Sequence, residues 1–103
     1  MSKKDTSQVM AEVAQFISSL KEARFEENNI TAVAHLGQLN WKMGSWDDNS
    51  VLEMAGCADL FIEAHDAVQQ ALDDARYDDI SGASHHTSRA IALLEVVYDK
   101  ISR

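Results

Sequence analysis

The segment from Ser50 to Arg76 carries the longest helical pattern in the chain, and it constrains the fold more than any other feature. At about 100° per residue, apolar side chains gather on one side of this segment and acidic side chains on the other. The apolar stripe contains Met54, Ala58, Phe61, His65, Val68 and Leu72. Ser50 and Glu53 have the spacing of an N-terminal capping box. The pattern therefore predicts one amphipathic helix over residues 50–76, with its apolar side in the core.

Three further segments carry helical patterns. They run from Thr6 to about Glu27, from about Ile30 to Gly44 and from about Ala83 to Ile101. The Asn28–Asn29 pair breaks the pattern, and a connection this short favours antiparallel neighbours. Gly37 lies inside the second of these segments at a cost of about 1 kcal/mol relative to alanine, so we expect another helix to approach closely there.

Composition agrees with a purely helical chain. Its 103 residues include no proline and four glycines, and 46% of them are apolar. Few helix breakers and a normal apolar content are typical of a folded helical domain. We therefore predict an all-α protein, an antiparallel four-helix bundle over residues 6–103 as a single domain, with a disordered tail over residues 1–5.

The sequence shows neither a membrane span nor a signal peptide. No apolar run approaches the roughly 20 residues that a span requires. The segment Met1–Asp5 lacks the apolar core of a signal peptide. We therefore expect a cytoplasmic protein. Cys57 is the only cysteine, and its position beside the apolar stripe fits a small buried hydrophobic residue.

Negative charge is concentrated in the middle of the chain. The net charge is −8, and residues 47–79 contain ten acidic residues against Arg76 alone. Binding to DNA or RNA requires clustered Lys and Arg, so direct nucleic-acid binding is disfavoured. A partner protein with a basic surface fits this charge, and so does a solvated helix face that maintains solubility. The candidate partner-binding residues are Asp59, Glu63, Asp66, Asp73 and Asp74.

Apolar residues exceed what one bundle core requires. A helix over residues 50–76 would be roughly 40 Å long, which is more than a domain of this size needs. The segments over residues 30–44 and 83–101 carry apolar residues on more than one side, which favours a second packing surface. We therefore expect a homodimer, although Trp46 also fits a side chain that folds back over the bundle end. The candidate self-association residues are Trp41, Trp46, Leu93, Val96 and Val97.

Histidines provide the candidate chemistry. His65 lies in the apolar stripe, where we favour a core histidine bonded to Tyr98 or Thr87 over a metal or small-ligand site. His85 and His86 are adjacent, so their rings diverge by about 100° and cannot share a metal within one helix. The Glu-x-x-His spacing of carboxylate-bridged metal sites is absent. We predict no metal and no cofactor.

His35 lies on the polar side of the second helical segment. An exposed histidine in a helical bundle of this length resembles the phospho-accepting residue of histidine phosphotransfer domains. In that family a leucine, a lysine and a glycine follow in order from two positions after the histidine, and Gly37, Gln38 and Leu39 occupy those places here. The resemblance is confined to Ala34–Leu39. It implies a phosphorelay protein that uses His35.

Three classes of function follow from these observations. No glycine-rich phosphate loop, Cys-x-x-Cys pair or nucleophile elbow is present, so we predict a protein that is not an enzyme. The preferred class is a small acidic interaction module of the adaptor, immunity or inhibitor type. It would bind its partner through the acidic helix or through a surface of residues 30–44 and 83–101. The alternatives are a phosphorelay protein using His35 and a metal-binding or ligand-binding bundle using His65 with His85 or His86.

Overall fold

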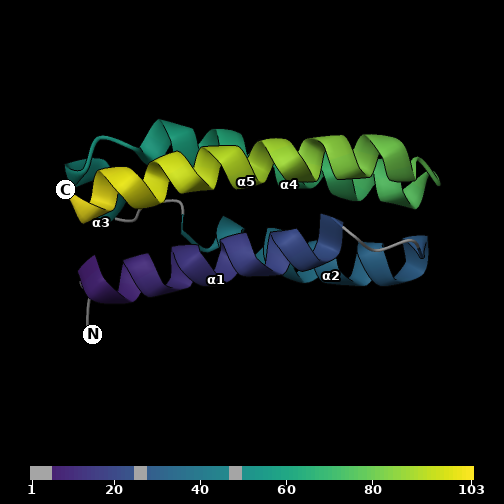
Figure 1. Cartoon of the computed structure of the whole chain (residues 1–103), viewed down its shortest axis with the longest axis horizontal. Helices are drawn as coiled ribbons and strands as arrows, with labels where there is room; N and C mark the ends of the chain where they lie inside the picture. The colour runs from purple at the N-terminus through teal and green to yellow at the C-terminus, as the bar shows by residue number, and fades with distance from the viewer. Residues whose placement is uncertain (1–5, 25–27, 47–49) are drawn as a thin grey trace.

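Two antiparallel pairs of helices form the two layers of this all-α protein (Figure 1). The computed structural model describes residues 6–24, 28–46 and 50–103. The helices in these ranges are α1 (Thr6–Arg24), α2 (Asn29–Gly44), α3 (Ser50–Met54), α4 (Ala58–Arg76) and α5 (Ile80–Ser102). In Figure 1, α4 and α5 lie in one layer, α1 and α2 lie in the other, and the beginning of α1 and the end of α5 lie at the same end of the bundle. The predicted tail over residues 1–5 and the expected helix end near Glu27 fall outside the described residues.

The prediction of one continuous helix over residues 50–76 is wrong. The chain ends α3 at Met54 and begins α4 at Ala58. Gly56 adopts a left-handed φ of 72°, which glycine tolerates because it lacks a Cβ atom. Its N–H donates to the carbonyl oxygen of Glu53 at 3.1 Å, and the N–H of Cys57 donates to that of Leu52 at 3.0 Å. These two bonds form a Schellman motif, the commonest way in which a glycine terminates a helix.

This break changes which side chains α4 contributes to the core. Met54, which we expected in the apolar stripe, is 89% exposed at the end of α3. Within α4 the prediction holds, because Phe61, Val68 and Leu72 are buried. The predicted amphipathic helix is therefore confirmed over residues 58–76, and its predicted continuation to Ser50 is wrong.

The turn between α4 and α5 closes in the same way without a glycine. Asp78 has a positive φ of 63°, and its N–H and that of Asp79 donate to the carbonyl oxygens of Ala75 and Asp74 at 3.2 and 2.8 Å. The Asp79 carboxylate then accepts from the N–H of Gly82 at 2.9 Å and caps α5. Because of this cap, α5 begins at Ile80 rather than at the predicted Ala83.

An aromatic cluster fills the core between the two layers. The rings of Trp46 and Phe61 stack at a centroid distance of 5.3 Å, and Phe16 meets Trp46 edge-on at 5.1 Å. Trp46 is 5% exposed, so it folds back over the bundle. Val97 is fully buried in α5. Both residues belong to the core, and their assignment to a self-association surface is corrected.

Among the described residues, Gly37 does not mark a close approach between two helices. A Cβ atom placed on Gly37 meets no heavy atom of the described residues within 4 Å, so the expected close approach of another described helix is absent there. The close approach occurs instead at Gly44, whose Cβ position lies 3.6 Å from Cε1 of His65 on α4. The glycine at the end of α2 therefore accommodates a side chain of the neighbouring helix.

Candidate functional site

The outward side of α4 carries a row of acidic side chains. Asp59, Glu63, Asp66 and Asp73 are all exposed, and their successive spacings of four, three and seven residues keep them on one side of the helix. Arg76 is the only Lys or Arg in α4. We call these four residues the acidic row.

Among the described residues, one ion pair involves a member of the acidic row. Nη1 of Arg76 lies 3.6 Å from Oδ1 of Asp73, and both side chains are more than half exposed. Exposed pairs of this kind contribute at most about 1 kcal/mol and leave the carboxylate accessible to other cations. The row therefore presents negative charge to solvent along most of the length of α4.

Asp74 faces α5 and does not belong to the acidic row. Its Oδ2 accepts a hydrogen bond from Nδ1 of His86 at 2.7 Å, and about a quarter of each side chain is exposed. The same oxygen lies 2.8 Å from the position of a Cβ on Gly82. Asp74 therefore holds the α4–α5 turn together, and its place among the partner-binding residues stays a prediction.

The adjacent histidines of α5 differ in their surroundings. His85 is exposed, whereas His86 is half-buried against Asp74. Their ring centroids are 5.4 Å apart and the ring planes meet at 70°. Across residues 6–24, 28–46 and 50–103, no group of three or more His, Cys, Asp or Glu side chains has the geometry of a metal site.

His65 bonds to α2 rather than to α5. Its Nε2 lies 3.1 Å from the carbonyl oxygen of Asn40, so the expected partners Tyr98 and Thr87 were wrong. The hydroxyl of Thr87 donates instead to the carbonyl oxygen of Ala83 at 2.7 Å. His65 therefore joins α4 to α2 at their point of contact.

His35 is half-buried on α2, next to the exposed side chains of Gln38 and Lys42. This placement agrees with a polar position on the helix. It does not test phosphoryl transfer, so the phosphorelay interpretation stays a prediction.

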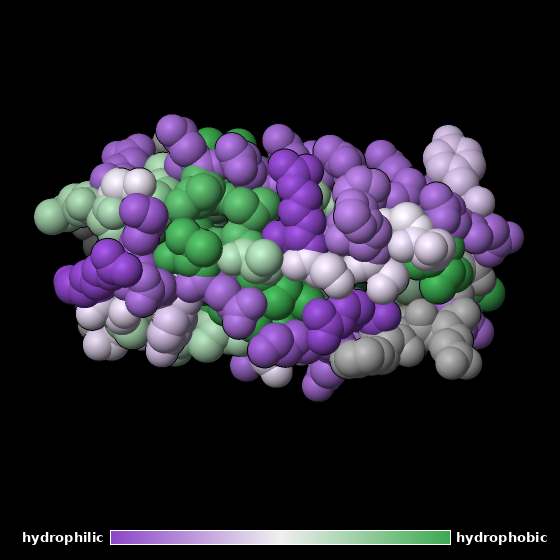
Figure 2. Space-filling model, turned by 45° about the horizontal axis from the view of Figure 1, so that its top comes forward, coloured by the Kyte–Doolittle hydropathy of each residue, from purple (hydrophilic) through white to green (hydrophobic). Residues whose placement is uncertain are grey.

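Three of the five candidate self-association residues remain accessible. Trp41 is 78% exposed on α2, Val96 is 45% exposed on α5, and Leu93 is half-buried. Ile30 and Ile62, which are not among these five candidates, are 76% and 51% exposed. Figure 2 shows one face of the molecule, on which polar side chains surround a cluster of apolar ones in the half nearer the chain ends. The exposed apolar side chains on this face therefore form a cluster and are not scattered over it.

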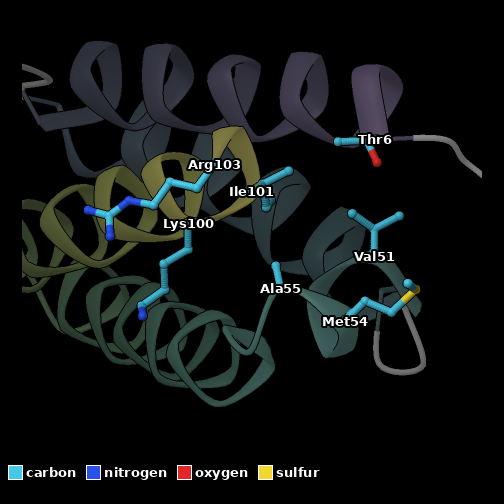
Figure 3. Close-up of a pocket in the computed structure, with 7 residues that line it drawn as sticks. All are labelled: Thr6, Val51, Met54, Ala55, Lys100, Ile101 and Arg103. Carbon is cyan, nitrogen blue, oxygen red and sulfur yellow. The ribbon is translucent and has the colours of Figure 1, made fainter.

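A hollow of about 200 Å³ lies at the end of the bundle where α3 meets α5. It is lined by Thr6, Val51, Met54, Ala55, Lys100, Ile101 and Arg103. In Figure 3 the charged ends of Lys100 and Arg103 point away from Val51 and Met54. The guanidinium of Arg103 is held by Asp99 at 2.7 Å. The sequence could not reveal this hollow, because it exists only where α3 separates from α4.

Comparison with protein-family models, with curated protein sequences and with solved structures found no match. No helix of the described residues is both long and apolar enough to cross a membrane.

Proposed function

We propose that this protein is a non-enzymatic interaction module that binds a partner protein with a basic surface through the acidic row of α4. The observation that supports this proposal most directly is the exposure of Asp59, Glu63, Asp66 and Asp73 on one side of a helix whose only cation is Arg76. A surface of one charge sign steers an oppositely charged partner and increases its association rate. Direct binding of nucleic acid remains disfavoured by the net charge of −8.

Self-association and a cytoplasmic location remain further parts of this proposal. The residues that support a contact between two copies are Val96, which is exposed, and Leu93, which is half-buried beside it on α5. Sedimentation of the wild-type protein and of Val96→Lys over a range of concentrations tests this part. A wild-type protein that stays monomeric at every concentration would exclude it.

Affinity capture tests the acidic row. The immobilised wild-type protein is compared with a variant that carries Asp59→Asn, Asp66→Asn and Asp73→Asn, in an extract of the cells that produce it. A control variant removes the same number of charges elsewhere, through Glu22→Gln, Glu53→Gln and Glu95→Gln, all at exposed positions. We expect a basic protein, identified by mass spectrometry, to be retained by the wild type and the control and lost from the acidic-row variant. Equal recovery from all three proteins would show that the row is only solvated surface.

A further inference from the structure

The outer edge of the contact between α2 and α4 exposes three large apolar side chains. Trp41 and Ile30 on α2 are 78% and 76% exposed, and Ile62 on α4 is 51% exposed. Trp is enriched among the residues that contribute most to binding between proteins. We call these three residues the apolar strip.

Helical geometry places the three residues of the apolar strip along the outer edge of the α2–α4 contact, which we call the seam. The contact between the helices is fixed by the hydrogen bond from His65 on α4 to Asn40 on α2. On a helix wheel of α2, drawn at about 100° per residue, the buried Leu36 faces the core. Moving around the wheel from Leu36, Asn40 comes first and Trp41 comes after it. On the wheel of α4, moving in the same direction from its core side, His65 comes first and Ile62 comes after it. The strip therefore borders the outer side of the α2–α4 contact from both helices.

The acidic row runs along the same seam. On the helix wheel, Asp73 and Asp66 follow directly after Ile62, and Asp59 lies one step further round α4. In contrast, residues 29–44 of α2 contain no acidic residue, and their one cation is Lys42. The seam is thus apolar in its centre, negative on the α4 side and free of negative charge on the α2 side.

Gly37 is half-buried on α2 between Ile30 and Trp41. Its Cβ position is open, with no heavy atom within 4 Å, although a glycine inside a helix costs about 1 kcal/mol relative to alanine. A ligand lying along the seam can approach the backbone of α2 closely at this position.

We propose that this seam binds an amphipathic helix of the partner protein, with apolar side chains on the strip and Lys or Arg residues against the acidic row. This inference rests on the proposed function and specifies the partner of the same surface. The distance from Ile30 to Trp41 along α2 is about 16 Å, which matches roughly three turns of a partner helix. Docking of an amphipathic helix along a groove is a common mode of peptide recognition, read through apolar residues spaced three and four apart.

Charge favours this partner over a second copy of the chain. Each copy has a net charge of −8, and two seams brought face to face would place like charges near one another. A basic helix avoids that repulsion, because its cations are attracted to the carboxylates of the acidic row.

A designed peptide tests the inference directly. The probe is a peptide of about 18 residues, roughly five helical turns, made of Leu and Lys with all Leu on one helical face. Its control is a scrambled isomer of the same composition and charge. Acrylamide quenching of tryptophan fluorescence provides the readout, because Trp41 is exposed and Trp46 is buried. We expect the helical peptide to bind at least about tenfold more tightly than the scrambled one and to protect Trp41 from the quencher.

Variants locate the binding. Measured by isothermal titration calorimetry, because the first variant lacks the fluorescent reporter, Trp41→Gln is expected to weaken binding of the helical peptide about tenfold or more. In contrast, Met54→Gln, which removes an apolar side chain exposed elsewhere, should leave binding unchanged. The triple substitution Asp59→Asn, Asp66→Asn and Asp73→Asn should also weaken it and reduce its dependence on salt.

The experiments distinguish a failure of the partner-helix inference from a failure of the proposed function. Equal binding of both peptides, with Trp41 still quenched, would overturn the inference and leave the acidic row as the binding surface. Binding that requires Trp41 but not the aspartates would overturn the proposed function. A failure of the helical peptide to bind would overturn the inference. Protection of Trp41 without peptide, together with dimers that Trp41→Gln dissociates, would show that a second copy covers the strip and would also overturn it.

Discussion

The backbone N–H of Cys57 donates a 3.0 Å hydrogen bond to the carbonyl oxygen of Leu52, and this bond separates α3 from α4. Both side chains are buried, at 0% and 2% exposure, as expected for the apolar contact that accompanies a Schellman motif. The chain thereby turns at Gly56, and the five-residue α3 is positioned against the ends of α4 and α5.

We predict opposite effects of the same substitution at two glycines. Gly56→Ala should lower the free energy of unfolding by roughly 1–2 kcal/mol, because its φ of 72° is strained for alanine. Gly37→Ala should raise it by about 0.5–1 kcal/mol, because this helical position is open. Urea unfolding followed by circular dichroism measures both. A neutral effect of Gly56→Ala would contradict the left-handed turn.

The two tryptophans should differ sharply in their contribution to stability. Trp46→Ala removes the ring that stacks on Phe61 at 5.3 Å and should cost about 3–5 kcal/mol. Trp41→Ala, at a side chain that is 78% exposed, should change the free energy of unfolding by at most about 0.5 kcal/mol. Chemical denaturation of both variants provides the measurement. Similar losses would mean that Trp41 is also packed.

Neighbouring aspartates at the end of α4 should also differ. Asp74→Asn weakens the 2.7 Å interaction with His86 that links α4 to α5 and should cost about 1 kcal/mol. Asp73→Asn affects only the exposed 3.6 Å pair with Arg76 and should stay within about 0.5 kcal/mol of the wild type. Thermal unfolding at neutral pH compares the two. Equal effects would argue against a role for Asp74 in holding the turn.

Cys57 should make stability fall at alkaline pH. Burial raises the pKa of its thiol above the ordinary value of 9.0, and the positive charge of Lys100 opposes that effect in part. The unfolded chain therefore loses the thiol proton at lower pH than the folded chain. As a result, the stabilisation is fully present below pH 9 and is lost as pH rises toward the folded pKa.

Cys57→Ala is the control for this pH dependence. The variant should be less stable overall, because it leaves space in the core, but its unfolding free energy should decline less between pH 8 and pH 10.5, a window of roughly two to three units around the ordinary thiol pKa. Identical slopes in the two proteins would contradict a buried protonated thiol. Slow reaction of the folded wild type with a thiol reagent is an independent check.

The bounds of α2 and the buried side of α4 were predictable because both depend on local chemistry. The bounds of α2 differ by one residue from the prediction, since Asn28 accepts from the N–H groups of Ile30 and Thr31 and caps the helix as such residues do. The buried stripe of α4 followed from its 3.6-residue period. The break at Gly56 was not predictable from periodicity, because the apolar stripe continues in phase through Met54.

For the candidate surface, the sequence alone determined which residues of α4 are acidic and that they share one side of a helix. It did so because helical spacing and charge are both local properties. Only the tertiary structure decided that Asp74 faces His86, that Trp46 and Val97 are core residues, and that Trp41 and Ile62 are exposed. These facts depend on which helix lies beside which, and that is set by packing between segments distant in the chain rather than by the pattern within any one of them.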